Sequence, residues 1–395
     1  MKIGMILDAQ FPPDPRVENE AITLVNSGFE VYLFCLSYSD CENEEYKGIK
    51  IRRYPTNKLN YKLSALAYTV PFYTKVMAKK IEDFITATSI DALHIHDIRI
   101  AEAVFKANKK YKLPTVLDLH DNMPEVIKFY PHLQKFPGKY IISPRKWKEK
   151  EAEFINLAKK VITVSPEFIN DLKNRFPKLI DKFSLVPNTI RSAFYTDFSL
   201  KESITKKYEA NFVMLYVGDT NIRRGLETPI RAIPLVKEAI PNIKLVIVGK
   251  NTTDYMLKKL VVDLGVEEYV DFEGWQDVSL FQSYIQASDV CISPLFRNRQ
   301  HDIAYANKLF QYMSFGKPLL VSDATAQKTL IQNIDGGLVH TERDEKDFAE
   351  KLLELYRDQE KRFQFGKNGE VFVKNDFNWE QTSKELITLY KNLES

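Results

Sequence analysis

Short apolar runs alternate with segments of helical periodicity along the whole chain, and this alternation constrains the fold more than any other feature. The pattern is typical of parallel strands joined by crossover helices. We expect strands in the first half at 2–7, 30–35, 49–54, 92–96, 115–119, 161–164 and 183–186. We expect strands in the second half at 212–217, 244–248, 270–273, 290–293 and 319–321. The sequence therefore predicts two doubly wound parallel sheets.

Length and composition indicate how these sheets are organised. With 395 residues and 44% hydrophobic content, the chain is too long for one ordinary core and suits two domains of nearly equal size. A polar stretch from Pro187 to about Ala210 is interpreted as the connection between them. No apolar run reaches the length of a membrane span, and Asp8 follows the first apolar residues too early for a signal peptide. We therefore expect a cytoplasmic protein.

The three cysteines, Cys35, Cys41 and Cys291, cannot all pair. Two of them lie in or beside strand-like runs, where a small buried hydrophobic residue is the expected role. We expect neither a disulfide nor a zinc site.

Positive charge is concentrated in two segments, although the formal net charge is only +3. Residues 52–81 hold seven Lys or Arg and no acid, and residues 128–150 hold seven against the single Glu149. Both segments carry aromatic residues, namely Tyr61, Tyr68, Phe72 and Tyr73 in the first and Phe129, Tyr130, Phe136, Tyr140 and Trp147 in the second. They indicate either a basic face for an anionic acceptor or membrane leaflet, or ordinary helices with solvated lysines and buried aromatics. Nucleic acid is not an expected partner, because no recognition motif accompanies the charge.

Ligands of doubly wound sheets bind beyond the carboxyl ends of the strands, so the residues that follow the strands are candidates. After the first strand, residues 11–17 hold three prolines that stiffen a loop carrying Asp14 and Arg16. Arg16 either faces a ligand or pairs with Glu18 or Glu20.

Two later strands end in a histidine followed by an aspartate, at His96-Asp97 and at His120-Asp121. A histidine in this setting is an oriented general base, a metal ligand or a hydrogen-bonded structural residue. The residues alone leave these three roles open.

In the second half, glycine turns follow three of the predicted strands. Gly218 opens a segment that runs through Arg223 and Arg224 to a helix, and backbone amides and guanidinium groups there suit a diphosphate. Gly249 and Gly274 each close a strand, where they permit close backbone approach to a ligand or serve as plain turn residues.

Residues 307–321 read as an amphipathic helix, a glycine stop at Gly316 and a buried strand. The helix N-terminus in such a unit can point at a phosphate.

Taken in order, these motifs resemble those of the retaining glycosyltransferases of family 4. Residues 307–318, Asn-Lys-Leu-Phe-Gln-Tyr-Met-Ser-Phe-Gly-Lys-Pro, are similar to the nucleotide-sugar segment NKLFEYMAxGKP of its Asn-Lys-Leu-Phe subgroup. Residues 11–17 resemble the family's FPPDPRV opening, 94–97 and 118–121 its HxHD and DxHD/E strand ends, and 377–380 its FxWE segment. The resemblance covers nearly the whole chain.

The resemblance implies a GT-B fold, in which two Rossmann-like α/β domains face each other across a cleft. An acceptor-side domain is expected at 1–190, a nucleotide-sugar-binding domain at 191–379, and a crossover helix at 380–395 that packs back on the first domain. The implied reaction is metal-independent transfer of a sugar from a nucleoside-diphosphate sugar to an acceptor hydroxyl with retention of configuration. The implied acceptor is carbohydrate or lipid-linked, in bacterial surface polysaccharide or glycolipid assembly, with peripheral contact to the inner face of the membrane.

The resemblance also assigns roles to residues. His120 would lie against the donor sugar and diphosphate, and Arg224 and Lys308 would stabilise the departing diphosphate without a metal ion or other cofactor. The donor site would also include Gly218, Arg223, Gly249, Gly274, Trp275, Asn307, Leu309 and Gln311. Asp14 and Arg16 would face the acceptor. His96 is expected to be structural, and Glu125 to cap or pair.

The chain departs from the family pattern at the donor site. Asp219 replaces the usual first cation, and Arg223 or Lys308 would have to compensate. Ile303 and Gln311 stand where the family carries two glutamates, and the loop 297–302 is an alternative source of sugar contacts. Two rival functions follow, a non-catalytic relative that binds a sugar nucleotide or a partner, and a nucleotide-sugar epimerase.

Overall fold

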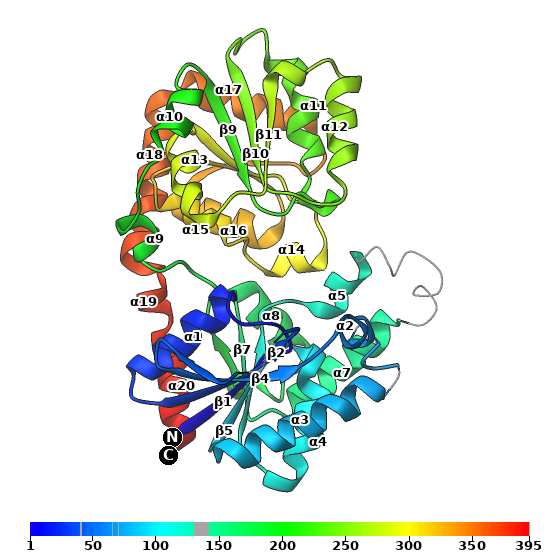
Figure 1. Ribbon diagram of the computed structural model, residues 1–395. Coiled ribbons are helices and arrows are strands. Elements are labelled where there is room, and N and C mark those ends of the chain that lie inside the picture. Colours follow the sequence, from blue (N-terminus) through cyan, green and yellow to red (C-terminus); the bar gives the residue numbers. More distant parts are fainter. Residues whose placement is uncertain (40–41, 65, 70, 130–141, 395) are drawn as a thin grey trace. The chain divides into compact units, whose positions relative to one another are not determined.

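The computed structural model describes residues 1–39, 42–64, 66–69, 71–129 and 142–394. The chain forms two compact units, one of Met1–Asn188 with Ser383–Ser395 and one of Thr189–Thr382 (Figure 1). Each unit is a sheet covered by helices.

The first unit is built on an eight-stranded sheet in the order β3-β4-β2-β1-β5-β6-β7-β8. Every neighbouring pair is parallel except β3 and β4. The strands are β1 (Lys2–Ile6), β2 (Glu30–Ser37), β3 (Glu44–Tyr46), β4 (Ile49–Pro55), β5 (Ala92–His96), β6 (Thr115–Leu119), β7 (Lys160–Thr163) and β8 (Phe183–Leu185). The α-helices are α1 (Pro15–Asn26), α2 (Lys58–Ser64), α3 (Phe72–Thr88), α4 (Ile98–Tyr111), α5 (Met123–Val126), α7 (Pro144–Leu157), α8 (Pro166–Arg175) and α20 (Lys384–Glu394).

The second unit is built on a six-stranded parallel sheet in the order β11-β10-β9-β12-β13-β14. Its strands are β9 (Phe212–Val217), β10 (Ile243–Val248), β11 (Val270–Gly274), β12 (Val290–Ser293), β13 (Leu319–Ser322) and β14 (Gly337–His340). Its α-helices are α9 (Ala193–Thr196), α10 (Glu202–Tyr208), α11 (Glu227–Val236), α12 (Asp254–Asp263), α13 (Phe281–Gln286), α14 (Arg299–Ile303), α15 (Lys308–Met313), α16 (Thr325–Ile334), α17 (Glu345–Arg357), α18 (Gln359–Val371) and α19 (Trp379–Thr382).

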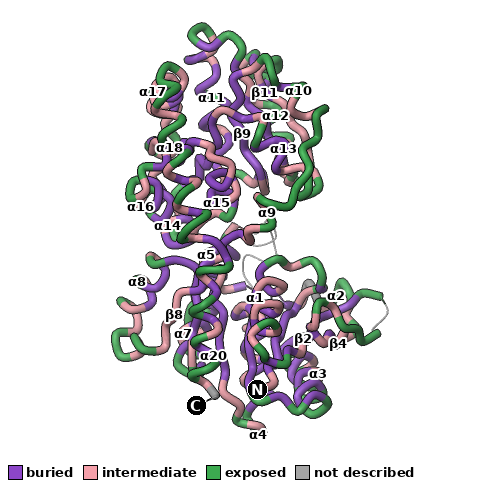
Figure 2. The backbone as a smooth tube through the Cα atoms, turned by 90° about the vertical axis from the view of Figure 1, so that its left-hand side faces the viewer, coloured by how far each residue is buried: buried purple, intermediate pink, exposed green. Residues whose placement is uncertain are grey.

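All predicted strands are present, each within two residues of its expected ends. The sequence reading missed β3 and β14, which are short edge strands without a continuous apolar run. Buried strands dominate both units in Figure 2. On β9, Met214 and Tyr216 pack on one face of the sheet and Val213 and Leu215 on the other, as the alternation of side chains in a strand requires.

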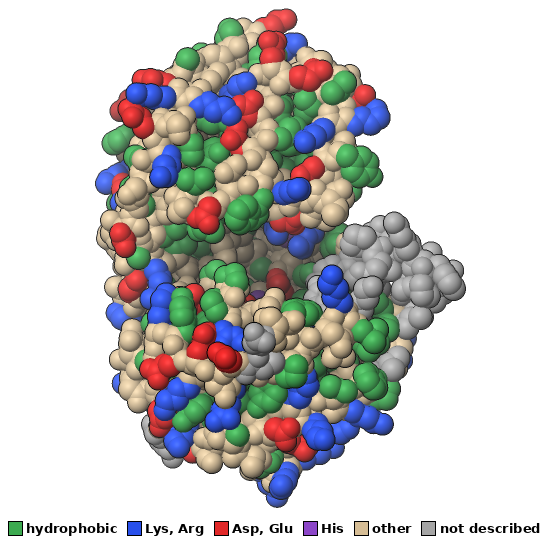
Figure 3. All heavy atoms as spheres, in the orientation of Figure 1, with side chains coloured by type: hydrophobic (Ala, Val, Ile, Leu, Met, Phe, Trp, Pro, Cys, Tyr) green, Lys and Arg blue, Asp and Glu red, His purple; other side chains and the backbone are tan. Residues whose placement is uncertain are grey.

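The structure bears on the expectations for the cysteines, for membrane-spanning helices and for surface charge. Cys35 and Cys291 are buried, as expected, and Cys41 lies outside the described residues. Among the described residues, no helix combines the length and hydrophobicity that crossing a bilayer requires. Figure 3 shows basic and acidic side chains interspersed on the visible face of each unit.

The aromatic residues of the two basic segments divide between core and surface. Tyr73 and Trp147 are buried, whereas Phe72 is 54% exposed. The Tyr68 ring packs edge-on against Trp147, with 4.7 Å between ring centroids. Tyr130, Phe136 and Tyr140, together with the side chain of Tyr61, lie outside the described part of the chain. The described aromatics thus belong mainly to the core, and Phe72 is the exception.

Candidate functional site

The second unit brings two glycine turns together at the carboxyl end of its sheet. Gly218 follows β9 with φ +127°, and Gly249 follows β10 with φ +151°. A Cβ atom on Gly249 would lie 1.8 Å from the carbonyl oxygen of Gly218, so a side chain there would force the two loops apart. Because neither glycine carries a side chain, the backbone of both turns is uncovered at the edge of the sheet where doubly wound sheets bind ligands.

Lys308, the first residue of α15, lies against this turn. Its side chain is only 8% exposed, and its Nζ atom lies 3.3 Å from the centroid of the Tyr216 ring. A Cβ on Gly218 would lie 3.6 Å from the same Nζ atom. Among the described residues, this ammonium group has no hydrogen-bond partner. Burial and the nearby Arg224 hold the pKa of Lys308 well below its usual range.

Arg224 supplies a second cation beside Lys308. It ends the short helix η4 (Ile222–Arg224) and precedes Gly225, whose φ of +73° and close approach to the Pro294 carbonyl oxygen exclude a side chain. The buried Nε atom of Arg224 donates no hydrogen bond within the described structure, but it lies 3.6 Å from the carboxylate of Asp219.

Asp219 occupies the position where the resemblance led us to expect a cation. The Asn251 side chain donates a 2.7 Å hydrogen bond to its carboxylate, and the Tyr216 hydroxyl donates to its carbonyl oxygen at 2.6 Å. Asp219 therefore offsets part of the charge of Arg224. Asp219 also acts on Lys308, where its carboxylate favours the charged form of the amine.

A pocket of about 370 Å³ opens at the ends of β10 and β11 and includes the Gly249 turn. It is lined by Gly249, Lys250, Asp254, Lys258, Phe272, Glu273, Gly274 and Trp275. Trp275 is 72% exposed and offers a ring face to solvent. Three of the predicted donor-site residues, Gly249, Gly274 and Trp275, thus lie in one pocket.

The other predicted donor-site residues do not line this pocket. The side chain of Leu309 is fully buried in the hydrophobic core, so its predicted part in the site does not extend to its side chain. Asn307 caps α15 without a side-chain hydrogen bond, and Gln311 is partly buried on the same helix. The Arg223 carbonyl accepts a 3.0 Å hydrogen bond from the Phe296 amide, which fixes η4 against the loop after β12.

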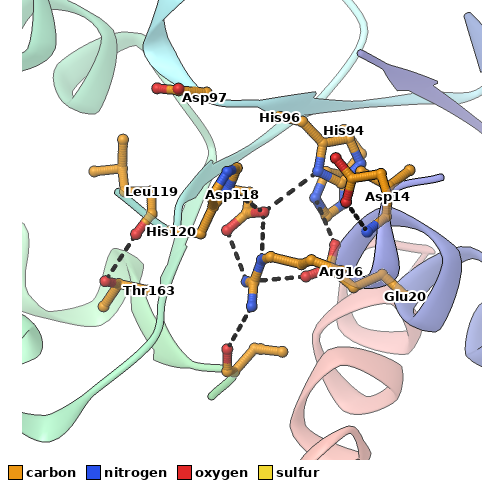
Figure 4. Close-up of polar contacts among 12 residues, drawn as sticks. Asp14, Arg16, Glu20, His94, His96, Asp97, Asp118, Leu119, His120 and Thr163 are labelled. Carbon is orange, nitrogen blue, oxygen red and sulfur yellow. Dashed lines mark hydrogen bonds and ion pairs between the residues drawn. The ribbon is translucent and has the colours of Figure 1, made fainter. Parts of the chain in front are cut away.

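In the first unit, the side chain of Arg16 is buried among carboxylates. The guanidinium is 4% exposed, binds both carboxylate oxygens of Asp118 at 2.7 and 2.8 Å, and lies 2.9 Å from Glu20 (Figure 4). It also donates to the carbonyl oxygen of Val186. The buried carboxylate of Asp118 requires a cation, and Arg16 supplies it. The expected acceptor-side role of Arg16 stays a prediction. The alternative pairing with Glu20 is confirmed.

Asp118 holds His120 in its charged form. The Nδ1 atom of His120 donates to Asp118 at 3.1 Å, and that of His96 approaches the same oxygen at 3.3 Å. Burial disfavours charge on His120, but the Asp118 carboxylate outweighs it and raises the pKa of His120 to about 10. Arg16 and His120 keep the pKa of Asp118 well below its usual range against the effect of burial. His120 is therefore an imidazolium at neutral pH, with Nε2–H left as a donor.

His96 and His94 extend this network inward. His96 is buried, and burial lowers its pKa, so its predicted structural hydrogen-bond role is confirmed. The His94 Nε2 atom lies 3.2 Å from the Glu20 carboxylate, which can only accept, so Nδ1 of His94 accepts from the Tyr390 hydroxyl at 2.8 Å. The network thereby fixes α20 to the sheet.

Glu20, His94, His96 and Asp118 offer ligand atoms that lie within 4.8 Å of one another. Within the described part of the chain, no other group of histidine and acidic side chains is this compact. Arg16 already neutralises both carboxylates, and a metal ion would lie against that guanidinium. We assign no metal to this cluster.

Asp97, which the sequence marked as part of a polar strand end without assigning it a role, is a functional candidate in the structure. It follows β5 with φ +71°, a conformation that few residues other than glycine adopt, and its side chain accepts from the Ile98 amide at 2.5 Å. Burial raises its pKa to about 7 despite the nearby His120. Two polar predictions nearby have structural explanations, because Asp14 caps α1 through the Val17 amide and Glu125 pairs with Lys128.

Comparison with known proteins agrees with both halves of this description. The family described as Glycosyltransferase Family 4 matches residues 16–194, and the family described as Glycosyl transferases group 1 matches residues 197–372. An uncharacterised glycosyltransferase, MJ1607, from Methanocaldococcus jannaschii is 23% identical over 99% of this chain and 98% of its own. The capsular polysaccharide biosynthesis glycosyltransferase CapM of Staphylococcus aureus is 23% identical over 48% of this chain and 49% of its own.

Solved structures share the fold across the whole chain. A sucrose-phosphate synthase from Thermosynechococcus elongatus superposes with a TM-score of 0.78 at 17% identity, covering 100% of this chain and 99% of the other. Anabaena HepE in complex with UDP-glucose superposes with a TM-score of 0.72 at 14% identity, covering 99% of this chain and 100% of its own.

Proposed function

The chain is a GT-B glycosyltransferase of the family 4 and group 1 type, and from this premise we propose that it transfers a sugar from a nucleoside-diphosphate sugar to an acceptor hydroxyl with retention of configuration, without a metal ion. The donor binds at the carboxyl end of the second sheet. Its diphosphate lies at Lys308 and Arg224, and its base enters the pocket at Gly249, Gly274 and Trp275.

The observation that carries this proposal is the buried ammonium of Lys308. Burying a charged group without a partner costs several kcal/mol unless an anion compensates it. Lys308 has no hydrogen-bond partner among the described residues and lies beside a second cation, Arg224. A diphosphate between these groups would supply the missing acceptors through charge-assisted hydrogen bonds.

The same two cations support the chemistry. As the bond between sugar and diphosphate breaks, negative charge grows on the leaving phosphate, and fixed cations in a partly dehydrated site stabilise it. The acceptor oxygen bonds to the anomeric carbon on the face from which the diphosphate leaves, and the leaving phosphate accepts the proton of that hydroxyl, so the configuration is retained. His120 contributes a positively charged hydrogen-bond donor that orients the sugar.

The substrate class rests on the relatives. HepE was solved with UDP-glucose and CapM belongs to capsular polysaccharide biosynthesis, so we assign a hexose nucleotide as donor and a carbohydrate or lipid-linked acceptor in surface polysaccharide assembly. A peripheral position on an anionic membrane surface is part of this proposal.

Thermal unfolding in the presence of nucleotides tests the donor site directly. The wild type, Arg224→Ala and the control Arg231→Ala, an exposed arginine on α11, are heated with UDP, GDP, ADP or dTDP in the presence of EDTA. A nucleotide at one hundred times its Kd should add about 2.7 kcal/mol to the free energy of unfolding. We expect one nucleotide to stabilise the wild type and Arg231→Ala but not Arg224→Ala. If no nucleotide stabilises the wild type, the donor site is wrong and a non-catalytic relative becomes the better explanation.

A further inference from the structure

His301, in α14 of the second unit, is a buried polar side chain that the proposed reaction does not yet use. It is 4% exposed, and its Nε2 atom is buried with no hydrogen-bond partner among the described residues. A buried ring nitrogen without a partner costs free energy, so its persistence calls for a ligand or another explanation.

The tautomer of His301 follows from its surroundings. Its Nδ1 atom lies 2.7 Å from the carbonyl oxygen of Phe296, which can only accept, and 2.9 Å from Nδ2 of Asn298, which can only donate. The amide of Asn298 already donates to the same carbonyl oxygen at 3.1 Å, so the shorter contact from Nδ1 to that oxygen decides the tautomer. Nδ1 therefore carries the proton, and Nε2 presents a lone pair. The backbone is fixed as well, because the Asn298 side chain accepts from the His301 amide at 3.0 Å.

The charges around His301 keep the Nε2 lone pair unprotonated. Burial and then Arg224, with Arg223 and Lys308, lower the pKa of His301 to about 3. The imidazole is therefore neutral over the physiological range. It is a neutral acceptor beside the two cations assigned to the diphosphate, and a neutral acceptor suits a hydroxyl group.

The order of strands indicates which part of the donor lies here. The base pocket lies at the ends of β10 and β11, the turn at Gly218 follows β9, and the loop carrying His301 follows β12. These strands are consecutive in the sheet, with neighbours about 4.8 Å apart. A nucleotide sugar has the linear order base, ribose, diphosphate and hexose. With its base beyond β10 and its diphosphate at β9, the hexose falls on the β12 side.

We propose that Nε2 of His301 accepts a hydrogen bond from a hydroxyl of the transferred hexose and so helps to select the donor sugar. This inference rests on the proposed function. It also gives the loop 297–302 a specific role at the place where Ile303 replaces an expected glutamate.

Two variants at this position separate a sugar contact from a supporting role. His301→Leu removes the acceptor, whereas His301→Gln can place an amide oxygen near the position of Nε2. Calorimetric Kd values are measured for two probe pairs, UDP with UDP-glucose and GDP with GDP-mannose, and circular dichroism verifies folding. For the pair that binds, we expect His301→Leu to weaken the nucleotide sugar about tenfold while the Kd of its nucleoside diphosphate changes less than twofold. His301→Gln should recover most of the loss.

Deoxyfluoro analogues of the same nucleotide sugar extend the test. The analogue that lacks the donated hydroxyl should bind the wild type about tenfold more weakly than the unmodified nucleotide sugar does. Its Kd should be the same for the wild type and for His301→Leu. Equal weakening of the nucleotide sugar and of the free diphosphate would show that His301 supports the cations instead, and this would overturn the assignment. An unchanged Kd for every probe would overturn it too. If the thermal test selects ADP or dTDP instead, that nucleotide and its glucose conjugate replace these probes. If the wild type binds no nucleoside diphosphate, the proposed function fails together with the assignment.

Discussion

Replacing Lys308 by methionine should stabilise the ligand-free protein and weaken its affinity for a nucleoside diphosphate. The ammonium group lies buried on the Tyr216 ring without a hydrogen bond among the described residues. Methionine has a similar length and can keep a favourable contact between sulfur and the ring. The substitution therefore removes a desolvated amine and leaves the packing nearly intact.

The magnitude follows from two opposing contributions. An unsatisfied buried polar group costs roughly 1–3 kcal/mol, and the cation–π contact with Tyr216 returns roughly 0.5–2 kcal/mol. We expect Lys308→Met to gain about 1 kcal/mol, which raises the Tm of a unit of this size by about 2–4 °C. Because the folded-state pKa of Lys308 lies below its unfolded value, the wild-type penalty is largest at low pH and disappears as the pH rises toward about 10.4.

The ligand should have the opposite effect on the two proteins. Loss of one charge-assisted hydrogen bond costs about 1.5–3 kcal/mol, which weakens a nucleoside diphosphate by roughly 10–150-fold. At a concentration that adds about 2.7 kcal/mol to the wild type, Lys308→Met should gain at most about 1.4 kcal/mol. Differential scanning fluorimetry with and without the nucleotide found for the wild type measures both effects.

Lys317 provides the matched control. It is also a lysine of the second unit, but its Nζ atom donates to the carbonyl oxygens of Gln286 and Ser288 at 3.0 and 2.7 Å. Lys317→Met leaves these acceptors unpaired, so it should lower the Tm and leave the nucleotide-induced shift unchanged. The reasoning would be refuted if Lys308→Met destabilised the free protein as Lys317→Met does, or if it retained the full nucleotide-induced shift.

Three further predictions concern the first unit. Asp118→Asn removes the charge that holds the pKa of His120 near 10, so the histidine should titrate several units lower in an NMR pH titration; a midpoint that stays near 10 would contradict the assignment. Asp97→Asn should stabilise the protein, since the raised folded-state pKa of about 7 makes Asp97 increasingly destabilising between pH 4 and 7, and the Tm difference from wild type should therefore grow across that range and level off above it. Finally, the exposed Leu59 and Phe72 lie in the basic segment 52–81, so we expect more protein to sediment with anionic vesicles than with neutral ones. Equal sedimentation with both kinds of vesicle would remove the argument for binding to a membrane surface.

The fold was accessible from the sequence because its strands are buried on both faces. Such strands are short, continuous apolar runs, as in Phe212–Val217, and the turns that follow them carry glycine. The edge strands β3 and β14 lacked this signal, since Glu44 and Glu45 make up most of the first and Gly337 begins the second. Pairing with a neighbouring strand, which no local pattern encodes, accounts for both.

The candidate site was predictable only in part. The glycine turn at Gly218 with the adjacent Arg224 indicated a diphosphate site from the residues, whereas Lys308 was assigned to the donor site through the resemblance. The pairing of Arg16 with Asp118 joins residues 102 positions apart, and the sequence alone did not distinguish it from a surface arginine at a strand end. The tautomer of His301 was similarly inaccessible, because it depends on the direction of the Phe296 carbonyl.

The two units use buried charge in opposite ways, and this difference explains why the donor is assigned to the second. In the first unit, Asp118 and Glu20 neutralise Arg16. These ion pairs connect α1 to the sheet, and Asp118 also binds His120. In the second unit, Lys308 Nζ has no hydrogen-bond partner within the part of the chain that the structure describes, and Nε of Arg224 lies 3.6 Å from Asp219. A buried cation that the fold leaves unpaired lowers stability and is retained where a ligand completes it. On the proposed function, the stability that the free protein loses at Lys308 would be recovered as affinity for the diphosphate.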